Sequence, residues 1–410
     1  MIADLLGWTG LIFAALVTLL LAYRQKKVAL ILGIAFTVRL VAVLFHYYVA
    51  PLPDGTTDAV GFERYAWQWA QGGFVAALGN YPGIDAYFYS WLMSLLYAIT
   101  ARSLLMLQSL SLLIGILGVY ATYQLARELW GCRTACKAAW LMALFPTVVQ
   151  YSALPMREAY VVLFFVLGLI FVVRWSRQGG ILPIIGGLLA FFVSTFFHGG
   201  MFVAALAFLM LVAWRSLKEL FSALYRRRLK VTTAIVLVIA LGTFVLYVTS
   251  GVSIQKLGTA AEMVSAERWF HYFETRDIGG AKYPEWTQPH VAVDFIWAVP
   301  LRAVYLLFSP FPWDLRRSVQ FIGFLDGLFY FTFILVIWRH RRNILTDPAA
   351  RSILFILIGL ILAFGVGTGN FGTALRHRAK FVAGLIVLAS YGLTFLRIGT
   401  KPPRLSSNSE

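Results

Sequence analysis

The sequence predicts an all-α fold, a polytopic bundle whose helices cross a membrane about eleven to thirteen times. Of its 410 residues, 60% are hydrophobic and only 13% carry a charge, which is far outside the composition of soluble domains. Apolar runs of about twenty residues recur along the whole length, and a helix needs this length to cross a bilayer. Lys and Arg gather in the short segments between the runs, as the positive-inside tendency requires.

Two apolar runs, residues 5–22 and 28–50, open the chain and are predicted to be spans. Between them lie Arg24, Lys26 and Lys27, which place this turn in the cytoplasm. The N-terminus and the loop after the second span are therefore expected outside.

That outer loop, residues 51–102, is the stretch around which the chain is organised. Pro53 and Gly55 interrupt any helix in its first part. From Asp58 onward, aromatic and apolar residues return at helical spacing, which predicts a short amphipathic helix on the membrane surface. The apolar run at 86–100 has only about fifteen residues, too few for an ordinary span, so we expect a juxtamembrane helix there.

The rest of the chain continues the alternation of spans and short polar turns. Further spans are predicted at residues 104–126, 138–152, 158–174, two in a hairpin that turns at 198–200 and ends near 215, then 232–249, 319–338, 353–367 and 381–396. A long outer loop, residues 250–318, contains a second juxtamembrane helix at 295–308. The sequence thus predicts one transmembrane domain over 1–400, with eleven spans and two half-inserted helices, and a disordered cytoplasmic tail over 401–410. Thirteen full spans is the alternative.

Two unlike sets of charge gather on the predicted outer face. The acidic set is Asp54, Asp58, Glu63 and Glu158, and the basic set is Arg157, Arg316, Arg317, Arg376, His377, Arg378 and Lys380. Cations on this face run against the positive-inside tendency, and clustered Arg suits phosphate recognition. Ordinary ion pairing with the carboxylates or with lipid phosphates is the alternative interpretation.

This pattern suggests transfer of a group from a lipid phosphate. A carboxylate would accept a proton from an acceptor hydroxyl, and the cations would offset charge on the leaving phosphate. No Walker A or Rossmann glycine pattern is present, so the donor is expected to be carried by a lipid. Although the net charge is +17, no folded basic face suggests nucleic acid; contact with anionic membrane lipids explains the excess.

A metal cofactor is not favoured. A divalent ion is conceivable through Asp54, Asp58 and His198, but their spacing matches no recognised ligand pattern. Cys132 and Cys136 would supply only two ligands.

Several stretches resemble the GT-C class, polytopic glycosyltransferases that use polyprenyl-phosphate-linked sugars and include the protein O-mannosyltransferase and lipid A aminoarabinose transferase families. Asp58 followed by Phe62, Tyr65 and Gly72-Gly73 looks like their first outer loop. The resemblance extends through the run YATYQLARELWGCRTACK at 120–137, through Leu144-Phe145-Pro146 to Glu158, and to Leu375-Arg376-His377-Arg378 before the last span.

The resemblance implies an enzyme of the bacterial cytoplasmic membrane with its site facing outside. It assigns the base to Asp58, with Asp54 second, and the lipid phosphate to Arg376 and Arg378. The family's adjacent acidic pair is here spread as Asp54-x-x-x-Asp58, which leaves the base ambiguous. No large C-terminal soluble domain follows, so the expected acceptor is a glycan or a lipid.

The predicted site therefore has Asp58, Asp54 and Glu158 as catalytic residues. Its predicted substrate-binding residues are Arg376, Arg378, His377, Arg157, Arg316, Arg317, Glu63, His198 and Lys380. A polymerase or ligase that uses a polyprenyl-pyrophosphate-linked oligosaccharide is the first alternative. A flippase for such lipids is the second. It would be expected to show internal repeats with charges or broken helices near mid-span in matched halves, whereas we find no convincing repeat and the charges gather at the outer lip. A purely structural membrane scaffold is the remaining interpretation.

Overall fold

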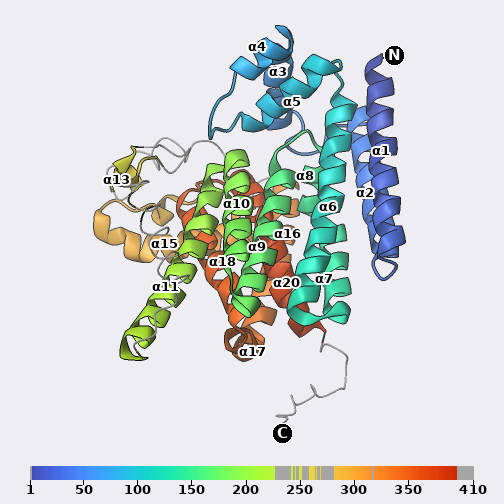
Figure 1. The fold of residues 1–410 in the computed structure, drawn as a ribbon. Helices are drawn as coiled ribbons and strands as arrows, with labels where there is room; N and C mark the ends of the chain where they lie inside the picture. Colours follow the sequence, from blue (N-terminus) through green and yellow to red (C-terminus); the bar gives the residue numbers. More distant parts are fainter. Residues whose placement is uncertain are drawn as a thin grey trace.

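The computed structural model describes residues 2–226, 281–315 and 318–394, with isolated positions between 242 and 268. This part of the chain is helical and holds no strand (Figure 1). Seven of its helices are long and apolar enough to cross a membrane: α1 (Ile2–Arg24), α2 (Ala29–Tyr48), α6 (Leu104–Trp130), α9 (Glu158–Gln178), α11 (Phe202–Arg226), α16 (Ser318–Arg339) and α18 (Pro348–Val366). Three shorter apolar helices are α5 (Phe88–Ile99), α10 (Ile181–Phe197) and α20 (Val382–Leu393). The predicted all-α polytopic membrane fold is confirmed.

Some predicted elements cannot be compared with the structure. The span at 232–249, much of the loop at 250–293, Arg316, Arg317 and the tail at 401–410 lie outside the described residues.

One end of the bundle, here called the α3 end, carries three short helices: α3 (Asp58–Ala70), α4 (Gly73–Gly79) and α5. They lie beyond the start of α6 rather than alongside the long helices (Figure 1). The Ser90 hydroxyl of α5 donates to the carbonyl of Phe62 at 2.9 Å. Arg102, between α5 and α6, makes two 2.8 Å hydrogen bonds to the carboxylate of Glu63. These contacts hold α3 against α5 and set the position of Asp58, the first residue of α3.

The continuous span predicted at 138–152 is wrong, because the chain breaks into α7 (Cys132–Leu144) and α8 (Pro146–Ala153). Pro146 has no N–H to donate back to α7, and it disfavours the helical conformation at the residue before it. Phe145 accordingly adopts an extended conformation with ψ 118°. Pro146 then serves as the first residue of α8, a position that proline favours.

The break leaves carbonyl groups at the end of α7 without helical partners, and Arg39 of α2 satisfies them. Its guanidinium donates to the carbonyls of Ala143 at 2.8 Å, Met142 at 3.3 Å and Ala35 at 3.2 Å. Arg39 is fully buried. Backbone groups at membrane depth must be paired within the protein, so Arg39 has a structural role in holding the broken helix.

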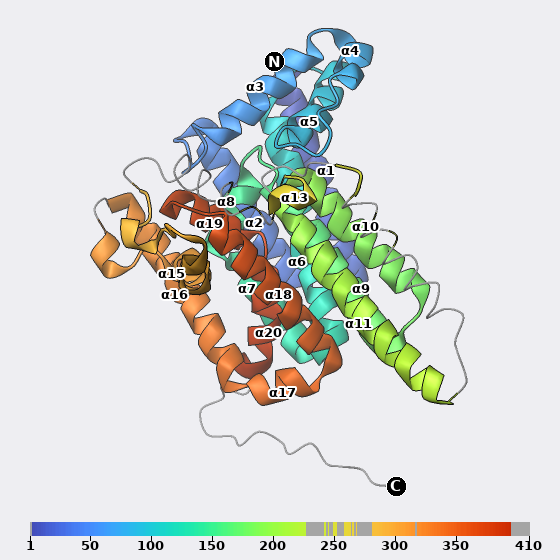
Figure 2. The same cartoon turned by 90° about the vertical axis from the view of Figure 1, so that its left-hand side faces the viewer.

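The long helices pack into one bundle around α6 and α9, with α11 and α18 side by side (Figure 2). The short helix α17 (Arg341–Thr346) lies at the end of the bundle opposite to α3 (Figure 2).

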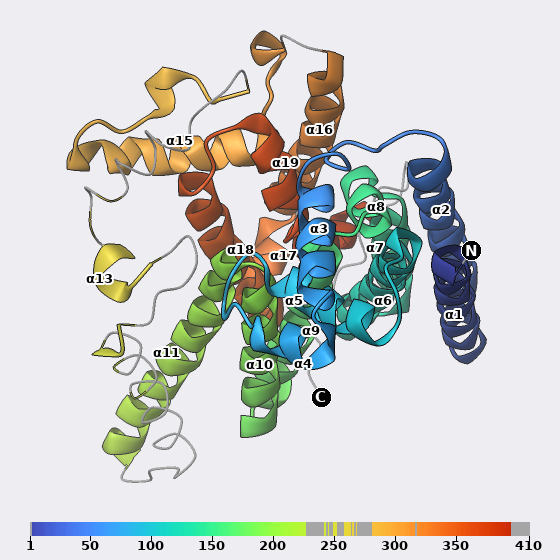
Figure 3. The same ribbon diagram turned by 90° about the horizontal axis from the view of Figure 1, so that it is seen from above.

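The stretch predicted as a second juxtamembrane helix forms α15 (Phe295–Phe308), which lies across the bundle when seen from the α3 end (Figure 3). Its backbone passes close to α18 because Gly365 has no side chain: a Cβ there would come within 2.8 Å of the amide nitrogen of Ala303.

Candidate functional site

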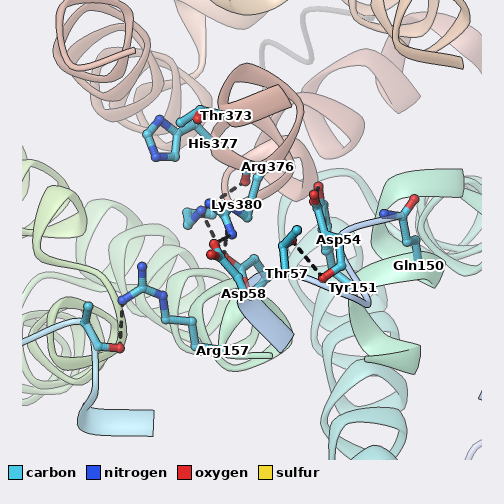
Figure 4. Close-up of polar contacts among 12 residues, drawn as sticks. Asp54, Thr57, Asp58, Gln150, Tyr151, Arg157, Thr373, Arg376, His377 and Lys380 are labelled. Atoms are coloured by element: carbon cyan, nitrogen blue, oxygen red, sulfur yellow. Dashed lines mark hydrogen bonds and ion pairs between the residues drawn. The ribbon is translucent and has the colours of Figure 1, made fainter. Parts of the chain in front are cut away.

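Three segments meet at the α3 end: the start of α3, the turn between α8 and α9, and α19 (Phe371–Ala379) (Figure 4). Asn370 caps α19, since its side chain accepts from the amide of Thr373 at 2.8 Å. Residues four apart lie on one helical face. The helix and the turn that follows it therefore present Arg376 and Lys380 together, toward α3 and α9.

Arg376 joins two carboxylates from distant parts of the chain. Its guanidinium forms an ion pair with Asp58, and its Nε lies 3.9 Å from Oε1 of Glu158. Lys380 Nζ lies 3.3 Å from the same Glu158 oxygen and donates to the carbonyl of Arg376 at 3.1 Å. The side chains of Glu158 and Lys380 are only 2% and 1% exposed, whereas that of Asp58 is 47% exposed. One carboxylate is thus enclosed and the other is open to a substrate.

Arg157 completes this group, which we call the ion-pair cluster: Asp58, Arg157, Glu158, Arg376 and Lys380. Its Nη1 donates to the carbonyl of Ala86 at 3.0 Å, and its guanidinium lies 5.2 Å from the ring centre of Phe62. Its Nε has no hydrogen-bond partner among the described residues. The cluster holds three basic side chains and two carboxylates, so it can accept a further anion.

The environment shifts the ionisation of the basic residues in different directions. Burial lowers the pKa of Lys380 to about 7 despite the neighbouring Glu158 carboxylate. Burial also acts to lower the pKa of Arg376, but the carboxylates of Glu158 and Asp58 outweigh it and raise that pKa above its usual range. Arg376 is therefore a permanent cation, and Lys380 can change its charge near neutral pH.

Asp54, the second predicted base, has different surroundings. Its carboxylate accepts a hydrogen bond from the hydroxyl of Tyr151 at 2.9 Å, and Gln150 Nε2 donates to the carbonyl of Pro53 at 3.0 Å. Asp54 has φ 62°, which is uncommon for a residue other than glycine. The loop is thus tied to α8, with Asp54 on the α8 side of Asp58 (Figure 4).

Arg378 is not part of the cluster. It is fully buried, its Nε pairs with Asp326 of α16 at 2.8 Å, and its other nitrogens donate to carbonyls of α15, α16 and Ser309. Residues two apart on a helix point to nearly opposite sides, so Arg378 faces away from the partners of Arg376. Arg376 and Arg378 therefore do not lie together in one site, as a shared phosphate-binding role would require.

Glu63 is likewise engaged elsewhere. Arg102 holds its carboxylate with both donors, and the hydroxyl of Tyr97 donates to it at 3.2 Å. Sequence reasoning missed these partners, because Arg102 and Tyr97 lie more than thirty residues further on.

The two predicted histidines come together beside the cluster. The rings of His198 and His377 lie 5.2 Å apart, and His377 Nδ1 lies 2.7 Å from the hydroxyl of Thr368. The ring of His377 points away from Asp58 (Figure 4). Among the described residues, no three His, Cys, Asp or Glu side chains are grouped so that they could hold a metal ion.

Comparison with known proteins finds similarity at the level of the fold. No family model and no curated protein matches the sequence. The solved structure of ArnT from Cupriavidus metallidurans bound to undecaprenyl phosphate is similar, with a TM-score of 0.51 over 90% of this chain at 14% identity. The chain has a GT-C-like fold. The match covers 60% of the length of ArnT, and at this identity it shows the fold alone.

Proposed function

We propose that this protein transfers a sugar from a polyprenyl-phosphate-linked donor to a hydroxyl of a glycan or lipid acceptor. The observation that carries the proposal is the Asp58–Arg376 ion pair, in which an open carboxylate meets a cation backed by buried charges. The GT-C-like fold and the undecaprenyl phosphate bound to ArnT support a lipid-phosphate donor. We place the reaction at the outer face of a bacterial cytoplasmic membrane.

The donor phosphate would bind at Arg376, Lys380 and Arg157. These side chains come from two different segments. Burial shields the charges of Arg157 and Lys380 from water, while the Arg376 side chain is 20% exposed. Preorganised cations in a water-poor site stabilise charge that develops on a leaving oxygen, an effect worth about 10²–10³ in rate for each donor. No metal is required for this role.

The acceptor oxygen would attack the anomeric carbon of the sugar as the bond from that carbon to the phosphate oxygen breaks. The bonding electrons leave with the phosphate, and the hydroxyl proton passes to the Asp58 carboxylate. In the free protein Arg376 occupies this carboxylate. Competition from the donor phosphate for Arg376 would loosen that ion pair and make Asp58 a better proton acceptor. Asp54 is the second candidate base.

Glu158 and Arg378 would be positioning residues. Glu158 is enclosed by Lys380 and Arg376, so it would hold both cations in place rather than meet the acceptor. Arg378 would anchor α19 against α15 and α16. Glu63 would likewise anchor α3, through its hydrogen bonds with Arg102.

An aromatic surface beside Asp58 would suit a sugar acceptor. The ring of Tyr87 lies 4.5 Å from Tyr65 and 6.2 Å from Phe62, and Tyr87 is partly exposed. Aromatic faces bind the apolar side of sugar rings, while nearby polar groups orient the hydroxyls.

The proposal is tested by comparing donors with the purified protein in nanodiscs. We expect transfer from a radiolabelled polyprenyl-phosphate monosaccharide, with EDTA without effect, and none from nucleotide sugars. Chain extension from a pyrophosphate-linked oligosaccharide alone would favour the polymerase or ligase. Movement of labelled lipid across vesicles without any product would favour a flippase.

A further inference from the structure

A groove lies far from the ion-pair cluster, between α9, α11 and α18, with a volume of about 760 Å³. Trp175, Trp214 and Phe355 are among its apolar lining residues. Trp175 is seventeen residues beyond Glu158 on the same helix, which places the groove about 25 Å from the cluster along α9. This distance is most of the thickness of a bilayer, so the groove belongs to the other side of the membrane.

Three basic residues, Arg215, Lys218 and Arg351, also line this groove. The guanidinium of Arg215 lies 5.3 Å from the ring of Trp175, and Lys218 Nζ lies 4.9 Å from the ring of Trp214.

Of these three cations, Arg215 forms an ion pair among the described residues, with Glu219 at 3.2 Å. Lys218 and Arg351 have no carboxylate partner in this part of the chain. The groove thus offers more positive charge than its own residues neutralise.

The position of Arg351 adds to this observation. It lies in the first turn of α18, whose N-terminus is capped by the Asp347 carboxylate, which accepts from the amide of Ala350 at 2.8 Å. Its Nη1 donates to the carbonyl of Leu345 at 3.3 Å, which leaves the rest of the guanidinium available. A bound anion would offset the excess charge of the groove.

We propose that this groove binds an anionic diacyl phospholipid of the membrane. The apolar part of the groove, between membrane-spanning helices, suits acyl chains. Its cations, near the membrane surface, suit a phosphate headgroup. Exposed Trp214 would lie at the interface, where amphipathic rings prefer to sit. The lipid would brace α11 against α9 and α18. This site is independent of the donor site, because none of its residues belongs to the ion-pair cluster.

The test measures thermal unfolding and native mass spectra of the detergent-solubilised protein with added lipids. Phosphatidylglycerol should raise Tm by about 5 °C, while phosphatidylcholine and water-soluble glycerophosphate should not. The double variant Lys218→Gln/Arg351→Gln should lose at least half of the shift. Arg342→Gln is the matched control, since this exposed arginine lies at the same end on α17 and should leave the shift unchanged.

An equal shift from phosphatidylcholine, or an unchanged shift in the double variant, would overturn the proposal. If the double variant does not fold, competition on the wild-type protein decides: native spectra must show phosphatidylglycerol retained in preference to phosphatidylcholine, and equal retention rejects the site. Asp58→Asn should keep the full shift, which separates this result from the donor assay.

Discussion

Arg376 of α19 forms an ion pair with Asp58 of α3, although 318 residues separate them in the sequence. The pair joins the first residue of α3 to α19, the helix before the last described helix. It brings a permanent cation and an open carboxylate to one point at the α3 end of the bundle (Figure 4).

Arg376 and Arg378 have different partners, Asp58 and Asp326 respectively. Arg376→Gln should fold normally and lower kcat/KM for the donor about 100-fold, because it removes a cation from the leaving phosphate. Arg378→Gln should instead lower the free energy of unfolding by about 3–5 kcal/mol, since it leaves Asp326 buried without its partner. Donor kinetics and thermal unfolding of both variants check this.

A paired replacement provides the control for Arg378. The double variant Arg378→Met/Asp326→Leu removes both charges of this buried pair. Much of the free energy of unfolding that Arg378→Gln loses should therefore return. If this double variant recovers both stability and transfer, Arg378 acts through the fold. If stability recovers but transfer does not, Arg378 has a direct role in binding the donor phosphate.

Donor binding should depend on pH through Lys380. Its pKa of about 7 means that the amine loses its charge as the pH rises through neutrality. A sugar phosphodiester keeps its negative charge over this range, so the donor KM should rise about tenfold between pH 6.5 and 8.5. Lys380→Arg should flatten the profile, and an unchanged profile in this variant would place the titrating group elsewhere.

The lowered pKa of Lys380 affects stability in the opposite direction from donor binding. An unfolded Lys keeps its proton up to about pH 10.4, so the unfolded state binds more protons between pH 7 and 10. The contribution of Lys380 to the free energy of unfolding therefore increases with pH in this window, while donor binding weakens.

Arg39 should matter for stability rather than for chemistry. Arg39→Leu leaves the carbonyls of Met142 and Ala143 without their donor and should lower the free energy of unfolding by about 2 kcal/mol. Arg24→Leu, at the exposed end of α1, should change it by less than about 0.5 kcal/mol. Loss of transfer in Arg39→Leu at unchanged Tm would contradict the structural role.

The Glu63–Arg102 pair should control how firmly α3 is held. Arg102 is 51% exposed, so water screens the pair and it contributes about 1 kcal/mol or less. Glu63→Gln should therefore leave Tm nearly unchanged but raise the rate of proteolysis at 71–87 by up to about fivefold. Restored protection in the reversed pair Glu63→Arg/Arg102→Glu would show that the contact itself is responsible.

The sequence predicted the fold class, because apolar runs and charge placement depend only on composition along the chain. It could not show that span 138–152 is broken, although Pro146 was a visible signal for a break. The partners of Arg39 could not be predicted from the sequence, because the carbonyls that it binds are free only where the helix breaks between α7 and α8.

For the site, Asp58, Arg157, Glu158, Arg376 and Lys380 were among the predicted residues, and the structure brings them together. Helical spacing could have separated Arg376 from Arg378, because positions two apart face opposite ways. Nothing local marks Asp326 as a partner of Arg378, since that contact joins two helices.

The Asp58→Asn variant tests the account most directly, when donor binding and single-turnover transfer are measured together in nanodiscs. Asparagine cannot accept the proton, so the rate of transfer should fall by at least about 100-fold. Donor binding should stay equal or become tighter, because Arg376 no longer shares its charge with a carboxylate. Transfer at the wild-type rate would contradict the assignment of Asp58 as the base, and loss of donor binding would contradict the division of roles between Asp58 and Arg376.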